Sequence, residues 1–152
     1  MNITIKCGDL LTATESVIGH QTNCQASMGA GVAKLVKQKY PEVYNIYRNF
    51  CRDYARRDCL GKTQLIQTNR GKFVANIFGQ LYYGTQARQT DYEALNSAFT
   101  DLKRQMRVIG LTSLALPYGI GCGLAGGEWT IVYGLIENNF CDSEIEVVLY
   151  KL

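Results

Sequence analysis

The chain has 152 residues, of which 47% are hydrophobic and 19% are charged, and its formal net charge is +3. This length predicts a single domain, residues 1–152, and the composition excludes an intrinsically disordered chain. No apolar run approaches the roughly 20 residues of a membrane span. The alternating start of the chain is unlike a signal peptide, so we expect a cytoplasmic protein without a membrane partner.

Strand and helix signals alternate along most of the chain. Runs of β-branched and apolar residues predict strands over 3–7, 16–20, 63–68, 73–78, 113–116 and 144–150, with a hairpin turn at 69–72. Apolar residues at helical spacing predict helices over 31–40 and 41–57, a third that begins near Asp91, and a fourth over 128–140. The apolar face of the first helix is expected to hold Val32, Leu35 and Val36. This order predicts an α/β fold with a mixed, mostly parallel sheet and helices on both faces.

The six cysteines and the single histidine do not follow the spacing of a metal site. No cysteine pair has the Cys-x-x-Cys spacing, and a chain with a full core does not need disulfides. No cluster of acidic residues in the sequence suggests two-metal chemistry. We therefore expect reduced cysteines, no metal ion and no cofactor.

Positive charge is concentrated in one part of the chain. Between Lys34 and Lys72 there are ten Lys or Arg residues and three acidic ones. Such a flank would steer a polyanionic ligand, or would form the solvated face of a helix. The net charge is too small to indicate nucleic acid by itself, and the basic stretch lacks aromatic residues clearly placed on the surface. The sequence therefore does not favour a nucleic-acid partner.

Three glycine-rich segments, 21–31, 79–84 and 117–127, each lie after a predicted strand and before a predicted helix. In a parallel sheet this placement brings them to the same edge, where ligands of α/β proteins bind. Glycine lets the backbone approach a ligand closely, and the free N–H groups at a helix start bind anions. Together the first and third segments predict a diphosphate site.

In these segments the sequence resembles the macrodomain family. The resemblance rests on Gly8-Asp9-Leu10, His20-x-x-Asn23-Cys24, Met28-Gly29-Ala30-Gly31-Val32-Ala33, Gly119-Ile120-Gly121-Cys122-Gly123-Leu124 and Val148-Leu149-Tyr150-Lys151-Leu152, and it covers essentially the whole chain. It implies a three-layer sandwich and an ADP-ribose-type ligand. The similar branch contains small single-domain members, among them ADP-ribose-1''-phosphate phosphatases and terminal ADP-ribose-protein glycohydrolases.

The resemblance also implies roles for individual residues. Asp9, with the Leu10 amide beside it, would accept a hydrogen bond from the adenine amino group, and Tyr150 would flank the adenine. Asn23 would hold the hydroxyls of the distal ribose. Backbone contacts to the phosphates and the distal ribose are implied at Gly29, Ala30, Gly31, Val32, Gly119, Ile120, Gly121, Cys122, Gly123 and Leu124. The residue types are also compatible with a cap at Asp9, an Asx turn at Asn23 and a core position for Tyr150.

Three further positions bear on the reaction. In the glycohydrolase branch a lysine attacks the anomeric carbon of the distal ribose and an aspartate assists, but Gln80 and Ala125 stand at those positions here. His20 matches a histidine of the phosphatase branch, although a core histidine bonded to backbone would also account for it. The resemblance implies hydrolysis of ADP-ribose 1''-phosphate to ADP-ribose and phosphate, with His20 as the catalytic residue. We also expect a monomer. The alternatives are a non-catalytic binder of ADP-ribose or similar signals, and an ADP-ribosyl hydrolase that does not use the family lysine.

Overall fold

A six-stranded sheet forms the centre of the structure, a computed structural model that describes residues 2–53 and 56–152. The strands are β1 (Ile3–Cys7), β2 (Val17–Thr22), β3 (Thr63–Gln67), β4 (Phe73–Phe78), β5 (Ser113–Pro117) and β6 (Glu146–Lys151). They lie in the order β1-β6-β5-β2-β4-β3, and every neighbouring pair is parallel except β3 and β4. The antiparallel β3–β4 pair confirms the predicted hairpin.

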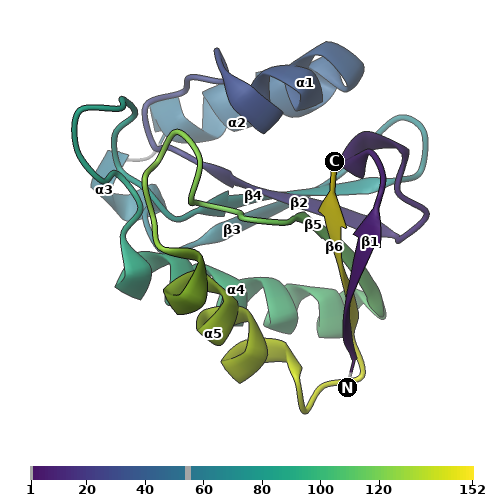
Figure 1. Cartoon of the computed structure of the whole chain (residues 1–152). Coiled ribbons are helices and arrows are strands. Elements are labelled where there is room, and N and C mark those ends of the chain that lie inside the picture. Colours follow the sequence, from purple (N-terminus) through teal and green to yellow (C-terminus); the bar gives the residue numbers. More distant parts are fainter. Residues whose placement is uncertain (1, 54–55) are drawn as a thin grey trace.

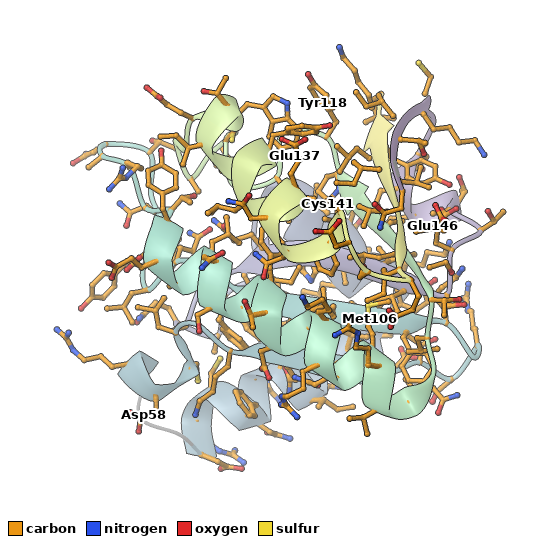
Figure 2. All side chains as sticks on the ribbon, turned by 90° about the horizontal axis from the view of Figure 1, so that it is seen from below. Asp58, Met106, Tyr118, Glu137, Cys141 and Glu146 are labelled. Carbon is orange, nitrogen blue, oxygen red and sulfur yellow. The ribbon has the colours of Figure 1, made fainter. Side chains whose placement is uncertain are left out.

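Helices cover both faces of this sheet (Figure 1). On one face lie α1 (Gly31–Lys39) and α2 (Pro41–Asp53), and on the other lie α4 (Tyr92–Ile109) and α5 (Trp129–Phe140). A short helix, α3 (Arg56–Cys59), precedes β3, and a 3-10 turn, η1 (Leu10–Thr12), follows β1. Figure 2 shows α4 and α5 from below, side by side across the sheet. The predicted three-layer α/β arrangement is confirmed. No helix among the described residues is both long enough and apolar enough to span a bilayer.

The periodic apolar residues of α4 explain the layer formed by α4 and α5. Leu95, Phe99, Leu102 and Met106 recur every three or four residues and are fully buried. They pack in one core with α5, where the rings of Phe99 and Phe140 meet edge to face at a centroid distance of 6.0 Å. Burying a large apolar side chain contributes about 1.5–3 kcal/mol to stability. This stripe therefore holds both helices on the sheet.

The helices on the other face follow the sequence prediction only in part. Val36, Val43 and Tyr47 are fully buried, but Leu35, predicted on the same apolar face as Val36, is 47% exposed, so only part of that face is buried. Successive helix residues point about 100° apart, and burying Val36 turns Leu35 outward. The helix predicted over 41–57 is observed as α2, which ends at Asp53, and as α3. Residues 54–55 lie outside the described residues.

Strand β2 continues two residues beyond the predicted strand. Gln21 and Thr22 keep the parallel pairing, opposite Ile77 and Phe78 of β4. His20 therefore lies inside the sheet, opposite Asn76, and the prediction that it stands at the strand end is wrong. The last three residues of β2 are polar although the strand is otherwise apolar.

Candidate functional site

Three loops meet at the carboxyl edge of the sheet. Loop A (residues 23–30) follows β2, loop B (79–91) follows β4, and loop C (118–128) follows β5. These strands are parallel neighbours in the order β5-β2-β4, so the loops lie at one edge, as the order of elements predicts. Residues of all three loops line a cleft of about 690 Å³, which is within the size range of small-molecule sites.

Most of the predicted site residues line this cleft. They are His20, Asn23, Gly29, Ala30, Gly31, Val32, Gly119, Ile120, Gly121, Gly123 and Leu124. Gln80 and Ala125 line it as well, so both positions compared with the family lysine and aspartate lie at the cleft. Cys122 belongs to loop C but lies outside the lining, with its thiol donating to the Ile120 carbonyl.

The residues predicted to contact adenine lie outside the cleft lining. Asp9 is exposed, and its Oδ1 accepts a 2.9 Å hydrogen bond from the Leu11 amide, so it caps η1. Leu10 and Tyr150 are buried, and the Tyr150 hydroxyl donates a 2.6 Å bond to Glu15 Oε1. A cap and a core position thus describe Asp9 and Tyr150 in the structure. Their contacts with adenine stay predictions.

The start of α1 presents unpaired amides to the cleft. Its N-cap residue, Ala30, supplies no side-chain hydrogen bond, whereas α4 is capped by Asp91, which accepts from the Ala94 amide at 3.0 Å. The first N–H groups of a helix have no acceptor within the helix, so the amides of residues 31–33 are available to a ligand. The helix dipole favours an anion at this end. Gly31 has a φ of 60°, a backbone conformation that residues other than glycine rarely adopt.

Loop C faces these amides across the cleft. A Cβ atom on Gly31 would lie 3.5 Å from Leu124 Cδ1, so the two segments approach closely. The amides of Ile120 and Cys122 close tight turns within loop C. Between and beside them, the amides of three glycines have no protein acceptor in the described structure. These are Gly119, Gly121 and Gly123. Unpaired N–H groups therefore flank the cleft on both sides, which suits an extended anion such as a diphosphate.

Gln21 connects β2 with loops B and C. Its Nε2 donates to Gln80 Oε1 at 2.8 Å and to Thr90 Oγ1 at 2.9 Å. The Thr90 hydroxyl in turn donates to the Gly121 carbonyl at 2.6 Å. Gln80 Nε2 donates to the Tyr82 carbonyl at 2.7 Å. Because both ends of the Gln80 carboxamide are engaged, this residue links loop B to the sheet and is not a reactive group.

The Asn23 carboxamide is largely engaged by neighbouring groups. Its Oδ1 accepts from the Gln25 amide at 2.9 Å and from the Tyr47 hydroxyl at 2.8 Å, and its Nδ2 donates to the Ser27 carbonyl at 2.9 Å. These bonds form the Asx turn that the sequence allowed. The fully buried Tyr47 of α2 holds this turn in place through its hydroxyl. One N–H of Nδ2 remains for a ligand hydroxyl. The contact of Asn23 with the distal ribose stays a prediction.

His20 lies at the floor of the cleft and is 1% exposed. Its Nε2 lies 2.7 Å from Asn76 Oδ1, and Asn76 Nδ2 donates to Gln64 Oε1 at 3.1 Å, so side chains of β2, β4 and β3 form one hydrogen-bonded chain. Burial lowers the pKa of His20 to about 4, and the bond to Asn76 opposes this shift only in part. The imidazole is therefore neutral at pH 7. Its Nδ1 is buried without a partner.

We expect this buried neutral histidine to make folding depend on pH. Histidine in the unfolded chain titrates near 6.5, whereas His20 in the folded protein titrates near 4. Its contribution to stability is therefore complete above pH 6.5 and declines as the pH falls towards 4. The loss at pH 4 amounts to about 3 kcal/mol.

Urea denaturation of the wild type and of His20→Gln at pH 7 and pH 4 measures this effect. Glutamine retains a donor for Asn76 but does not titrate, and the chain has a single histidine. Any difference between the two proteins in how the free energy of unfolding depends on pH is therefore due to His20. The same pH dependence in both proteins would contradict a buried neutral imidazole.

The described lining of the cleft carries no fixed charge. None of its residues is Asp, Glu, Lys or Arg. Across residues 2–53 and 56–152, no three or more His, Cys, Asp or Glu side chains are grouped to hold a metal ion. Burial raises the pKa of Cys24 in loop A to about 12, so its thiol stays protonated. The described lining therefore offers an anion backbone amides in place of charged side chains, and its one imidazole is uncharged at pH 7.

A second hollow of about 600 Å³ lies at the start of β3 and along α4. Its lining includes Asp101 and Arg104, which form a 2.6 Å ion pair. Asp101 also accepts from the Thr63 amide at 2.9 Å and from Gln105 Nε2 at 3.0 Å. The bond from the Thr63 amide fixes α4 to β3, and the other two contacts hold Asp101 in place within α4, so we assign this hollow a structural role.

Several polar residues of the cleft were not predicted from the sequence. Gln21 and Thr22 continue β2, and the run of polar residues that ends this apolar strand was the available signal. Tyr83 and Thr85 of loop B also line the cleft, and nothing in the sequence of 79–90 distinguished them from their neighbours.

Comparison with known proteins gives a match over most of the chain. The family model described as Macro domain matches residues 20–136. The DNA ADP-ribosyl glycohydrolase of Mycobacterium tuberculosis is 26% identical over 152 residues, which cover 97% of this chain and 42% of that protein. The chain thus spans less than half the length of this relative. The ADP-ribose 1''-phosphate phosphatase of Debaryomyces hansenii is 28% identical over 171 residues, which cover 92% of this chain and 94% of that protein.

The fold has close structural counterparts as well. A solved structure titled as the macrodomain of Mycobacterium tuberculosis DarG superposes with a TM-score of 0.86 at 26% identity. The superposition covers 99% of this chain and 97% of that one, so the two proteins share the whole fold.

Proposed function

The chain belongs to the macrodomain family, and we propose that it binds ADP-ribose in the cleft and hydrolyses ADP-ribose 1''-phosphate to ADP-ribose and phosphate. The proposal rests on two groups of backbone amides that have no protein acceptor. One group lies at the start of α1 and the other in loop C, and they face each other across one cleft. They would bind a diphosphate without any cation. The phosphatase name of a relative that matches 92% of the chain supports the reaction.

The orientation of the ligand follows from the side chains at the end of β2. Asn23 is the first residue of loop A and has one free N–H, with which it would hold the distal ribose. The phosphate on that ribose would then lie near His20, the only imidazole of the described cleft lining. With its pKa lowered to about 4, His20 is neutral at pH 7 and would act as a weak general base. Backbone amides would stabilise the phosphate charge during the reaction.

ADP-ribose is expected to bind at least about ten times as tightly as AMP. AMP reaches only one of the two groups of amides and leaves the Asn23 N–H unused. ADP-ribose reaches both groups of amides and the Asn23 N–H. Isothermal titration calorimetry with both ligands measures the difference. Equal affinities would show that loop A and loop C do not act on one ligand.

The reaction is tested by incubating the protein with ADP-ribose 1''-phosphate and measuring released phosphate. We expect turnover that persists in the presence of a chelator, since the described residues offer no metal cluster. We further propose that the protein acts as a monomer in the cytoplasm, and sedimentation velocity checks the monomeric state.

A second candidate function is a non-catalytic ADP-ribose binder. The burial of His20 and the engagement of its Nε2 by Asn76 favour it, since a fixed imidazole has less freedom to exchange protons. Tight ADP-ribose binding without any phosphate release would select this function over the hydrolase.

A further inference from the structure

Three consecutive side chains at the carboxyl end of β2 hold buried polar atoms without a hydrogen-bond partner. They are His20 Nδ1, Gln21 Oε1 and Thr22 Oγ1. All three residues line the cleft, and His20 and Thr22 are more than nine-tenths buried. Buried polar atoms in proteins are nearly always paired, so this cluster indicates a group that the chain itself does not supply.

His20 and Thr22 act on the same side of the sheet. Alternate residues of a strand face the same side, and their positions lie about 6.6 Å apart along it. One small group that makes two hydrogen bonds of about 2.8 Å each joins atoms up to about 5.6 Å apart, so it bridges the two side chains where their polar atoms lie closer together than these backbone positions. Gln21 points to the opposite side, where its carboxamide holds Gln80 and Thr90.

The hydrogen-bond chain across the sheet fixes the chemistry of this pair. Asn76 uses its Nδ2 to donate to Gln64, so its Oδ1 faces His20 and Nε2 of His20 carries the proton. His20 Nδ1 is then an acceptor only, while the Thr22 hydroxyl both donates and accepts. The bound group must donate a proton to Nδ1, which a phosphate or ether oxygen does not do. A ribose hydroxyl of the ligand and a water molecule both do, and of these two only water is present in the ligand-free protein.

We propose that His20 Nδ1 and Thr22 Oγ1 together bind one water molecule and that this water is the nucleophile of the hydrolysis. The inference rests on the proposed function. No carboxylate, lysine or arginine belongs to the described cleft lining, so a water activated within it has His20 as its proton acceptor. Thr22 directs the second hydrogen bond and thereby fixes the water oxygen.

The step balances without any further reactant. The water oxygen forms a bond to phosphorus while the bond from phosphorus to the 1''-oxygen breaks, and one water proton passes to His20 Nδ1. The 1''-oxygen leaves and takes up this proton, directly or through solvent. The products are ADP-ribose and inorganic phosphate, and His20 returns to its neutral form.

Thr22→Val tests the proposal, because valine has the shape of threonine and suits a buried strand position. We expect kcat for ADP-ribose 1''-phosphate to fall by about 10- to 100-fold while the affinity for ADP-ribose stays within about twofold. Thr22→Ser restores a hydroxyl and is expected to recover most of the kcat. An unchanged kcat in Thr22→Val together with a raised melting temperature would overturn the proposal, since removal of a merely unpaired buried hydroxyl stabilises a protein.

A crystal structure of the ligand-free protein provides a test that does not depend on turnover. Ordered density for a water oxygen at about 2.6–3.2 Å from both His20 Nδ1 and Thr22 Oγ1 is the expected result. Its absence would overturn the water site even if the protein proves to be a phosphatase. A wild type that shows this water but releases no phosphate would refute the proposed function and with it the nucleophilic role, while the water site itself would be supported.

Discussion

Gly31→Glu is expected to weaken ADP-ribose binding by more than about 100-fold, equivalent to about 2.7 kcal/mol. Gly31 is the first residue of α1, and a Cβ there would point to within 3.5 Å of Leu124 across the cleft. A carboxylate at this point would occupy the anion site at the helix start and repel the diphosphate. Calorimetric titration with ADP-ribose measures the loss.

Gly31→Gln is the matched control for this substitution. The φ of Gly31 is 60°, so any side chain adds backbone strain of about 1–2 kcal/mol, and both variants are expected to remain folded at a lower melting temperature. Glutamine has nearly the size of glutamate but no charge, so the difference between the two variants isolates repulsion. Wild-type affinity in Gly31→Glu would show that the start of α1 does not bind a phosphate.

The arrangement of the sheet could be predicted from the sequence because it follows from periodicity. The alternation of strands and helices places the loops after β2, β4 and β5 at one edge, and their glycines indicate backbone contacts to a ligand. Eleven predicted site residues accordingly line the cleft: His20, Asn23, Gly29, Ala30, Gly31, Val32, Gly119, Ile120, Gly121, Gly123 and Leu124. These predictions needed only local patterns and the family resemblance.

The hydrogen-bonding roles within the cleft could not be predicted, because they depend on residues far apart in the chain. Gln80 is held by Gln21, 59 positions earlier, and His20 is held by Asn76, 56 positions later. No local pattern indicates that these side chains meet. For the same reason the burial that lowers the pKa of His20 emerges only when β2 is placed between β4 and β5.

The wild-type protein is expected to leave glutamate-linked and thymidine-linked ADP-ribose intact by the lysine route, and borohydride is expected to trap no adduct. That route needs an amine to attack the distal ribose, and no lysine belongs to the described lining of the cleft. Gln80 stands at the compared position, but its carboxamide forms no imine and is held by Gln21 and the Tyr82 carbonyl. Mass spectrometry of the reduced protein measures the result. A trapped wild-type adduct would contradict it, and peptide mapping would identify the amine.

Gln80→Lys combined with Ala125→Asp is expected to introduce a trappable adduct, because both positions line the same cleft. The gain depends on the new amine reaching roughly 3–3.5 Å from the anomeric carbon. Gln21 Oε1, which is buried and unpartnered, is expected to accept a hydrogen bond from this amine and hold it back. Adding Gln21→Ala to the double variant should therefore increase the yield of adduct, and Gln80→Lys alone is the control without the assisting carboxylate. If neither the triple variant nor the control gives an adduct, position 80 does not face the distal ribose, and the comparison of Gln80 with the family lysine is wrong.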